Sequence, residues 1–379
     1  MGSLYGTECN MGVKQLQLAS INLKDFRCFS QETIDLDSPI VLICGSNGTG
    51  KTSLLEALYY GCYLRSFRTH LSRDLIAIGK DSFFVKLVVR DNSLNSMVDH
   101  TIQIGFAHNK RLVKVDNKTT VSYKDLLSHY RIVSLTEDDL KLVQDGPEER
   151  RAFVDQALLL NDASYIAKMR EYKIVLENRN ALLQKEVIDN EAYFIWTKKL
   201  WEHTAGIQAL RTHILSQLET EVNAMLHEHI DENVSVAFVY QAKKASDLEF
   251  EAFLQKNGSL AELMRSEMYF KRSGFGAHVD DFAIVLEGKK SRAYASRGQQ
   301  KMIVLLIKIA QIKQLSQKNG PVIFLLDDFM TDFDNDRGRA LLSALLKLDC
   351  QLIFTSPRRD SALESALTTS GLPYKIISM

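Results

Sequence analysis

Two polar segments of this sequence have the residue types that hold phosphate groups. Residues 45–52 read GSNGTGKT and fit the pattern G-x-x-x-x-G-K-[ST] at every fixed position. Glycines let backbone N–H groups close around phosphate oxygens, Lys51 can reach the β and γ phosphates, and the Thr52 hydroxyl can ligate magnesium. With Ser53 opening the helix that follows, this segment predicts a site for ATP and Mg²⁺.

The second polar segment, residues 295–301, reads ASRGQQK and opens a predicted helix. A helix N-terminus with small residues favours anions, so the hydroxyl of Ser296 and the backbone N–H groups near Gly298 and Gln299 can point at a phosphate. The same residues could serve only as the cap of their own helix. Taken alone, the segment favours this interpretation as a helix cap.

Two adjacent carboxylates follow an apolar run. Residues 321–328 read PVIFLLDD, which predicts a buried strand that ends in Asp327 and Asp328. Asp327 is placed to hold magnesium directly or through water, and Asp328 to orient or deprotonate an attacking water. An ordinary strand with a polar loop is the alternative. The phosphate loop elsewhere in the chain favours the catalytic interpretation.

Composition indicates a folded globular protein. The chain has 379 residues, 45% of them hydrophobic, enough for one large domain with an insertion or for two domains. Lys and Arg number 47 and so do Asp and Glu, so any nucleic-acid binding must rely on a local basic patch. The five cysteines have no CxxC spacing, which favours buried thiols. No apolar run approaches the roughly 20 residues that span a bilayer, and we expect a soluble cytoplasmic protein that does not bind membranes.

Hydrophobic patterns predict the elements that position these segments. Residues 40–44 form an apolar run typical of a strand buried on both faces, directly before the phosphate loop, and residues 53–64 predict the helix after it. Residues 83–115 predict an antiparallel meander, and residues 147–232 have long helical periodicity.

The rest of the chain alternates strands and helices. The predicted elements are a strand at 234–240, a helix at 248–268, a hairpin near 282–286, helices from 299 and from 337, and strands at 322–326, 351–355 and 374–378. Alternation of this kind is typical of a mainly parallel sheet covered by helices, so the chain is predicted to have an α/β fold with a helical insertion.

The order of GSNGTGKT, ASRGQQK and LLDD resembles the ATPase heads of the ABC family, in which a signature turn of one subunit closes on the nucleotide of the other. More narrowly, the chain resembles the RecF family of DNA replication and repair proteins. The similarity runs from INLKDFRCF through GSNGTGKTSLLEALYYGCYLRSFRTH, TEDDLKLVQDGPEERRAFVDQ, ENRNALL and GFGAHVDDFAIVLEGKK to SRGQQK and FLLDDF. It covers nearly all of the chain after the first dozen residues.

The resemblance implies a P-loop ABC-type ATPase head with a mixed sheet, flanking helices and an antiparallel β subdomain. Residues 12–146 and 273–379 would be its two halves, and residues 147–272 a mainly helical insertion lobe. It also implies an ATP-dependent DNA-binding switch in recombinational repair and replication restart. ATP would drive dimerisation on duplex DNA near single-strand gaps, hydrolysis would be slow, and RecR would be the direct partner that, with RecO, helps load RecA.

The resemblance assigns roles to individual residues. The residues expected to bind nucleotide are Gly45, Ser46, Asn47, Gly48, Thr49, Gly50, Lys51, Thr52, Ser53 and Arg27, with Ser296, Gly298 and Gln299 acting on the partner's ATP. Lys51, Asp327 and Asp328 are expected to be catalytic, with Thr52 and Asp327 as metal ligands. Asp334 belongs to a loop that crosses the dimer interface, and a segment like the Q-loop falls around residues 136–144.

DNA binding is expected at a short basic cluster. Arg65, Arg68 and Arg73 lie within nine residues of one another, and related heads place an arginine at the position of Arg68 that touches phosphate or DNA. A solvated face is the alternative for a charge run of this length. No segment predicts a helix that reads bases, so binding is expected to be independent of DNA sequence.

Several positions depart from the family pattern. The usual GPHRDD reads GAHVDD at residues 276–281, where Ala277 and Val279 stand for proline and arginine. The loop after the carboxylates reads MTDFD at 330–334, and Thr355-Ser356 replace the usual switch histidine. Asp328 is also shorter than the glutamate of many related ATPases, which favours slow hydrolysis. His278 beside two acids is interpreted as a structural turn rather than a metal site.

Two other functional classes fit the sequence less well. A structural, SMC-like ATPase head needs a coiled coil of hundreds of residues, and the predicted helical insertion is far shorter. The ATPase subunit of a transporter would be expected to have the switch histidine.

Overall fold

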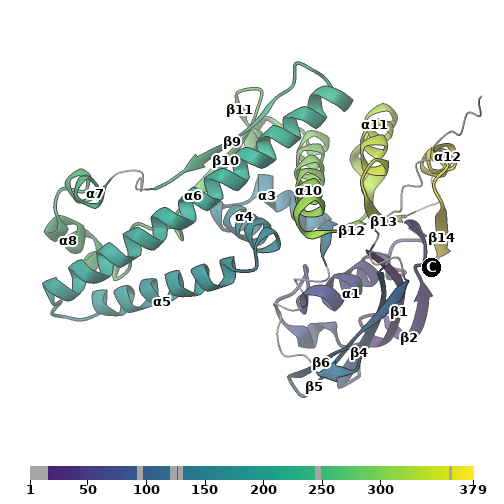
Figure 1. The fold of residues 1–379 in the computed structure, drawn as a ribbon, viewed down its shortest axis with the longest axis horizontal. Coiled ribbons are helices and arrows are strands. Elements are labelled where there is room, and N and C mark those ends of the chain that lie inside the picture. Colours follow the sequence, from purple (N-terminus) through teal and green to yellow (C-terminus); the bar gives the residue numbers. More distant parts are fainter. Residues whose placement is uncertain (1–15, 92–96, 120–125, 127–130, 244–248, 358–360) are drawn as a thin grey trace, which may run out of the picture. The chain divides into compact units, whose positions relative to one another are not determined.

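The computed structural model describes residues 16–91, 97–119, 126, 131–243, 249–357 and 361–379 (Figure 1). The first residues of the chain, with Cys9 and the start of the expected 12–146 segment, lie outside this range. The chain divides into two compact units. The first comprises Met1–Thr136, Leu315–Thr331 and Leu345–Met379, and the second comprises Glu137–Gln314 and Asp332–Ala344.

The centre of the first unit is a five-stranded parallel sheet of order β14-β3-β13-β12-β8. Its strands are β14 (Tyr374–Ser378), β3 (Ile40–Cys44), β13 (Cys350–Ser356), β12 (Val322–Leu326) and β8 (Ile132–Leu135). Every residue of the four strands other than β14 is buried. Continuous apolar runs of this kind are what a parallel sheet covered on both faces requires. The strands expected at 40–44, 322–326 and 374–378 are confirmed.

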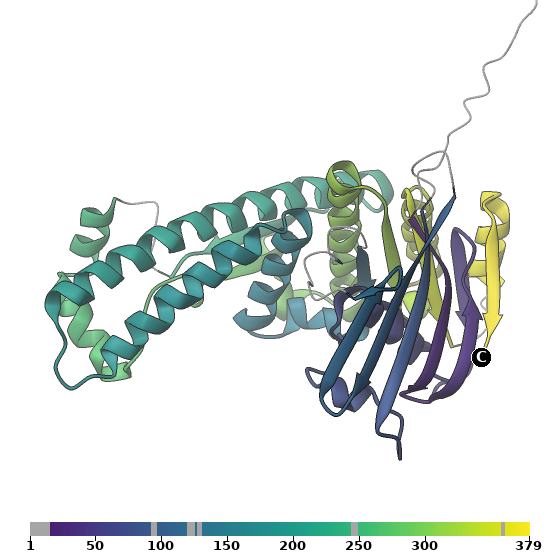
Figure 2. The same cartoon turned by 60° about the horizontal axis from the view of Figure 1, so that its bottom comes forward.

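A second sheet of the first unit is antiparallel (Figure 2). Its order is β2-β1-β4-β5-β6-β7, with β1 (Leu16–Phe26), β2 (Phe29–Asp35), β4 (Ser82–Asp91), β5 (Val98–Ala107), β6 (Lys110–Val115) and β7 (Lys118–Thr119). Strand β4 alternates buried and less buried residues, as expected for a sheet with one covered face. The antiparallel meander expected from the sequence is confirmed. Its strands form a sheet of their own and do not pair with the parallel sheet.

The remaining elements of the first unit are mostly helical. They are α1 (Lys51–Tyr63), the 3₁₀ turn η1 (Ser72–Leu75), α12 (Ser361–Ser370) and most of η3 (Phe329–Asp332). Helix α1 follows β3 through the phosphate loop and is buried along nearly its whole length. Two helices, α10 (Arg297–Asn319) and α11 (Asn335–Leu346), have residues in both units.

Long helices dominate the second unit. Its helical elements are η2 (Glu137–Leu140), α3 (Lys141–Gln144), α4 (Pro147–Asn161), α5 (Tyr165–Leu183), α6 (Asn190–His229), α7 (Phe250–Lys256), α8 (Leu260–Phe270) and α9 (Ser291–Tyr294). Helix α5 lies alongside the 40-residue α6 in both views (Figures 1 and 2). Three strands, β9 (Val236–Gln241), β10 (Asp281–Leu286) and β11 (Lys289–Lys290), form an antiparallel sheet of order β11-β10-β9.

One predicted helix is divided in two. The single helix expected at 248–268 is interrupted between α7 and α8, and its first residue lies outside the described ranges. Gly258 has φ 92°, a left-handed conformation that ends α7, and the Ser259 hydroxyl accepts a hydrogen bond from the Glu262 N–H and so caps α8. The Asn-Gly-Ser sequence at 257–259 is therefore a helix end followed by a helix start.

None of the helices in the described ranges is both long and apolar enough to cross a membrane.

Candidate nucleotide-binding site

The phosphate loop joins a buried strand to a helix in the first unit, as the motif requires. Gly48 and Gly50 have φ values of 88° and 106°, left-handed conformations that suit glycine. A Cβ atom at Gly50 would lie 2.7 Å from the Cys28 sulfur, so space also requires glycine there. Gly50 caps α1 without a side-chain hydrogen bond. Glycine has no side chain that could bond to the first N–H groups of α1. A helix N-terminus of this kind binds phosphate.

The Lys51 side chain folds back over the loop. Its ammonium donates hydrogen bonds to the carbonyl oxygens of Gly45 at 2.9 Å and Ser46 at 3.0 Å, and the residue is only 6% exposed. Thr49 closes the turn from the other side, since its hydroxyl donates to the Ser46 carbonyl at 3.0 Å. The carbonyl oxygens of Gly45 and Ser46 thus hold the loop in shape by accepting hydrogen bonds from the buried Lys51 and from Thr49.

Asp327 meets the phosphate loop at the carboxyl edge of the parallel sheet. Its Oδ2 accepts a hydrogen bond from the Thr52 hydroxyl at 2.8 Å, and its Oδ1 accepts one from the Thr355 hydroxyl at 2.6 Å. Thr52 follows β3 and the phosphate loop, Asp327 directly follows β12, and Thr355 is near the end of β13, which lies between the other two strands. Ligands of parallel α/β sheets bind at this edge.

The oxygen atoms at this edge fit Mg²⁺. Magnesium binds proteins through one or two carboxylates or hydroxyls and takes its other ligands from substrate phosphates and water. The Thr52 hydroxyl and the Asp327 carboxylate converge to 2.8 Å beside the loop, which supplies such a partial set. Within the described ranges, no cluster of three or more His, Cys, Asp or Glu side chains could form an all-protein metal cage.

Asp328 has an unusual backbone conformation. Its φ is 44°, in the left-handed region that aspartate tolerates better than most residues. The Asp328 N–H donates to the Thr355 hydroxyl at 2.9 Å, and the Asp328 carbonyl accepts from the Thr331 hydroxyl at 2.8 Å. Thr355 therefore contacts both residues of the carboxylate pair. Thr355 is one of the two residues that stand where the family pattern has its switch histidine.

A buried carboxylate that the sequence analysis missed organises two of the predicted arginines. Glu56 is fully buried on α1 and accepts two hydrogen bonds from Arg27, at 2.7 and 2.8 Å, and one from Ser66 at 2.5 Å. Arg68 lies 3.7 Å from the same carboxylate. The hydrogen bond with Glu56 is the largest effect on Arg27 and raises its pKa. Glu56 lies one helical turn after Thr52, a spacing that places it near the phosphate loop.

The other two arginines of the predicted basic cluster lie nearby in sequence but have different surroundings. Arg65 lies over the Tyr63 ring, 5.9 Å from its centroid. Arg73 is 66% exposed and lies 3.8 Å from the Asp74 carboxylate. Two of the three predicted DNA contacts, Arg68 and Arg73, are thus beside carboxylates of the same unit.

The second polar turn lies in the second unit and caps its own helix. The Gln299 N–H donates to the Ser296 hydroxyl at 3.3 Å, and the Gln299 side-chain oxygen accepts from the Ser296 N–H at 2.8 Å. This reciprocal pair is a capping box. Gly298 allows close approach of the loop after β12, because a Cβ atom there would lie 2.9 Å from the Asp332 carbonyl oxygen.

Residues 136–144 were expected to contain a segment like the Q-loop. In the second unit, the Gln144 amide donates to the side-chain oxygen of Gln300 at 2.7 Å. Gln300 in turn donates to the Ala295 carbonyl at 3.1 Å. Gln144 therefore contacts the start of α10, as does Glu137 of the same segment through Arg297.

An ionic network surrounds the second turn. The Asp332 carboxylate accepts hydrogen bonds from Lys301 at 3.1 Å and from Arg297 at 3.2 Å, and Arg297 also pairs with Glu137. Burial raises the pKa of Asp332, but the hydrogen bond from Lys301 and the charges of both cations outweigh it, so the net shift is downward. Asp332 lies in the stretch where the sequence departs from its relatives, and its role was not predicted.

Replacing Asp332 by alanine is expected to lower the free energy of unfolding by about 1–3 kcal/mol, because Lys301 is only 5% exposed and loses a charged partner. The pKa of Asp332 is lowered in the folded state, so the pair stabilises the protein above the ordinary aspartate pKa and the effect is lost as the pH falls through the lowered value. Urea unfolding at several pH values would measure it. The gap between wild type and variant should narrow below about pH 4, and a gap that does not depend on pH would contradict this account.

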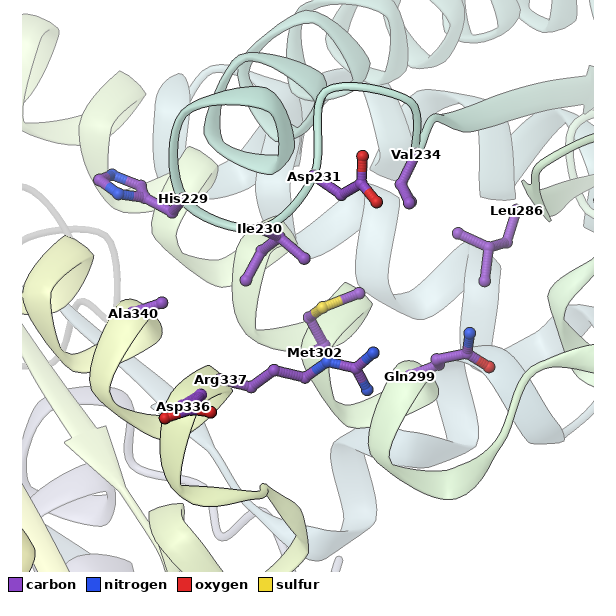
Figure 3. Close-up of a pocket in the computed structure, with 10 residues that line it drawn as sticks. All are labelled: His229, Ile230, Asp231, Val234, Leu286, Gln299, Met302, Asp336, Arg337 and Ala340. Atoms are coloured by element: carbon purple, nitrogen blue, oxygen red, sulfur yellow. The ribbon is translucent and has the colours of Figure 1, made fainter.

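A pocket of about 270 Å³ lies beside the second turn (Figure 3). Gln299 and Met302 of α10, Arg337 of α11 and residues at the end of α6 line it, and the Arg337 side chain extends between α11 and α10 in the close-up. The pocket is formed within the second unit and contains none of the phosphate-loop residues.

The segment that departs from the GPHRDD pattern is a hydrogen-bonded structural turn. The hydroxyl oxygen of Tyr172 lies 2.6 Å from Nδ1 of His278. Burial lowers the pKa of this histidine. Asp280 is fully buried and accepts hydrogen bonds from Gln208 at 2.6 Å and Tyr240 at 2.9 Å. These contacts agree with the structural interpretation of His278.

Comparisons with known proteins agree with this geometry. The family model described as AAA domain matches residues 20–319. DNA replication and repair protein RecF of Geobacter sulfurreducens is 29% identical over 346 residues, which cover 90% of this chain and 93% of the relative. RecF of Caldanaerobacter subterraneus subsp. tengcongensis is 27% identical over 337 residues, covering 87% and 92%.

Solved structures also show similarity to RecF. A structure of the recombination mediator protein RecF with ATP, from the RecFOR pathway, has a TM-score of 0.79 at 25% identity and covers 93% of this chain and 94% of its own. The Smc head domain of Pyrococcus furiosus has a TM-score of 0.53 at 13% identity and covers 93% and 92%, a likeness of fold alone. The expected ATPase head fold with parallel and antiparallel sheets and a helical insertion is thereby confirmed. The chain belongs to the AAA domain family and, within it, to the RecF family of ATP-binding DNA replication and repair proteins.

Proposed function

We propose that this protein is an ATP-dependent DNA-binding switch of recombinational repair and replication restart. ATP and Mg²⁺ bind at the phosphate loop, and two copies close so that the Ser296 turn of each contacts the nucleotide of the other. The closed dimer holds duplex DNA near a single-strand gap, and slow hydrolysis releases it. RecR is the direct partner, and with RecO the protein helps load RecA in the cytoplasm.

The observation that carries the proposal is the meeting of Thr52 and Asp327 at 2.8 Å beside Lys51. A phosphate loop, a metal-ligand hydroxyl and a strand-end carboxylate are the parts that P-loop ATPases use to hold ATP and its magnesium. Bound magnesium would neutralise phosphate charge there. Lys51 would exchange its loop carbonyls for phosphate oxygens, and the Thr52 hydroxyl and Asp327 would ligate the ion.

The remaining residues have supporting roles in the proposal. The backbone from Gly45 to Ser53 holds the phosphates, and the hydrogen bonds that Arg27 donates to Glu56 keep Arg27 oriented near the loop. Asp328 orients or deprotonates the attacking water, and the hydroxyl of Thr355 fixes its backbone through the Asp328 N–H. The loop that contains Asp334 contributes to the dimer interface.

Light scattering of the purified protein with and without a slowly hydrolysed ATP analogue tests the proposal. The mass of wild type should double on addition of analogue and Mg²⁺. The Lys51→Ala variant should stay at the monomer mass, because it lacks the cation that holds the β and γ phosphates. An unchanged wild-type mass, measured while a fluorescent ATP analogue is shown to bind, would contradict the switch.

A further inference from the structure

The stretch from β10 to the start of α10 has a concentrated positive charge. Residues 287–301 contain Lys289, Lys290, Arg292, Arg297 and Lys301 against the single acid Glu287. The whole chain has equal numbers of cations and anions, so this stretch is a local exception. Nucleic-acid binding by a protein of zero net charge needs such an exception.

Only part of this charge is neutralised within the second unit. Arg297 and Lys301 pair with Glu137 and Asp332, as described above. Lys289, Lys290 and Arg292 are all exposed, and among the described residues no carboxylate lies within ion-pair distance of them. We call these three residues the hairpin cations.

The backbone fixes the positions of the hairpin cations. Glu287 and Gly288 have φ values of 49° and 75° and form the tight turn between β10 and β11. The turn pairs Lys289 with Leu286 and Lys290 with Val285. Positive φ at both turn residues matches the right-handed twist of a two-residue hairpin. The cations are therefore presented by a hydrogen-bonded hairpin rather than by an extended loop.

The two hairpin lysines point to different surroundings, as adjacent residues of a strand do. The Lys289 ammonium lies 5.5 Å from the centre of the Tyr294 ring, and that ring is 70% exposed. Lys290 instead lines a pocket of about 180 Å³ together with Arg292 and Arg150. Asp281 is the one carboxylate of that pocket, and Arg150 already neutralises it through hydrogen bonds of 2.7 and 2.9 Å.

The basic cluster predicted from the sequence is less suited to bind DNA phosphates than the hairpin cations are. Arg68 and Arg73 lie 3.7 and 3.8 Å from the carboxylates of Glu56 and Asp74. A DNA phosphate would have to compete with these anions, whereas it meets no such competitor at the hairpin cations. Arg27 and Arg68 are better explained as side chains that Glu56 holds near the phosphate loop.

We propose that Lys289, Lys290 and Arg292 form a contact surface for the phosphate backbone of duplex DNA, next to the Ser296 turn in sequence. This inference rests on the proposed DNA-binding switch and specifies where that switch grips its DNA. The contacts are to phosphates, and the surface reads no bases. The surface lies a few residues before the turn proposed to contact the partner's ATP, so DNA and nucleotide would bind to neighbouring parts of one segment.

The test is fluorescence anisotropy of a labelled gapped duplex with the full chain and a slowly hydrolysed ATP analogue, over a range of salt concentrations. Replacing all three hairpin cations by glutamine should weaken binding at least about tenfold near 0.1 M salt. It should also reduce the slope of log K against log salt by about 2 to 3, because each phosphate contact contributes about 0.9. The charge-conserving variant Lys289→Arg, Lys290→Arg, Arg292→Lys should keep wild-type affinity.

A matched control removes the same charge elsewhere. Lys168, Arg170 and Lys185 are exposed cations on or just after α5 in the same unit, and their glutamine variant should lose less than about threefold in affinity. Equal losses in both triple variants, or none in the hairpin variant, would overturn the proposed surface and leave the switch intact. Failure of wild type to bind DNA with the analogue would overturn both.

A competitor distinguishes DNA from an acidic protein segment. Unlabelled duplex should displace the labelled DNA much more effectively than polyaspartate at equal charge concentration. Equal displacement by polyaspartate would assign the hairpin cations to an acidic protein partner instead.

Discussion

Replacing Ser296 by arginine is expected to abolish ATP-dependent dimerisation while leaving nucleotide binding at the phosphate loop intact. In the proposed closed dimer, the Ser296 turn faces the nucleotide of the other copy. The arginine side chain would fill the space that the small serine leaves for the nucleotide, so the two copies could not close on it. Since overpacking a closed interface costs about 3 kcal/mol, self-association should weaken by about a hundredfold. Light scattering with the ATP analogue measures the loss.

The structure provides a sharp control for this experiment. The Ser296 hydroxyl accepts a hydrogen bond from the Gln299 N–H at 3.3 Å, and the Ser259 hydroxyl accepts one from the Glu262 N–H at 3.2 Å. Both serines are N-caps within the second unit, and loss of either cap costs about 1 kcal/mol. Ser259→Arg should therefore have a similar effect on stability and still dimerise with ATP.

The two interpretations of the turn give different outcomes here. If Ser296 serves only its own helix, the Ser296→Arg and Ser259→Arg variants will dimerise alike. A monomeric Ser296→Arg variant that still binds a fluorescent ATP analogue would support a site shared between two chains. The capping box seen in the structure is compatible with both, because a hydroxyl can accept from Gln299 and still donate to a phosphate.

Local sequence was enough to predict the strand, loop and helix around Lys51. A buried apolar run, a glycine-rich loop and a helix have to follow one another there, and each is encoded within a few residues. The same holds for β12 and its two carboxylates. These elements depend on side-chain pattern and on glycine conformations, which short segments largely determine.

Contacts that depend on the order of strands in the sheet could not be predicted from the sequence. Thr355 contacts Asp327 and the Asp328 backbone because β13 lies between β3 and β12, and no single sequence pattern gives the order of parallel strands. Glu56 and Asp332 were missed for a similar reason. Their partners Arg27 and Lys301 lie 29 and 31 residues away, so the pairing appears only in the folded chain.

The basic cluster shows a different limit of sequence reasoning. Charge density along the chain directed attention to Arg65, Arg68 and Arg73, but it does not reveal which cations are neutralised by carboxylates brought close by folding. Lys289, Lys290 and Arg292 lie at least as close together in sequence as those three arginines. Among the described residues, no carboxylate forms an ion pair with them. The domain boundaries at 146/147 and 272/273, and the roles of the site residues, stay predictions.

Replacing Asp328 by asparagine is expected to slow ATP hydrolysis by about a hundredfold or more and to prolong the ATP-bound dimer in proportion. An amide cannot take a proton from water, and general-base catalysis typically contributes two to four orders of magnitude. Steady-state phosphate release would give the rate, and the decay of the scattering mass after ATP is exhausted would give the dimer lifetime. Asp349→Asn, an exposed change of the same chemistry directly before β13, is the control and should leave both the rate and the dimer lifetime unchanged.

Asp328→Glu separates the reach of the carboxylate from its presence. Glutamate extends the carboxylate by one methylene, which should bring the base closer to the water and raise the rate above that of wild type. The left-handed backbone at this position, with φ 44°, opposes the gain because glutamate tolerates it less well than aspartate, at a cost of about 1 kcal/mol. A faster Glu variant with a slightly lower urea midpoint would identify Asp328 as a base set back by its length. An Asn variant as fast as wild type would assign the base to another residue.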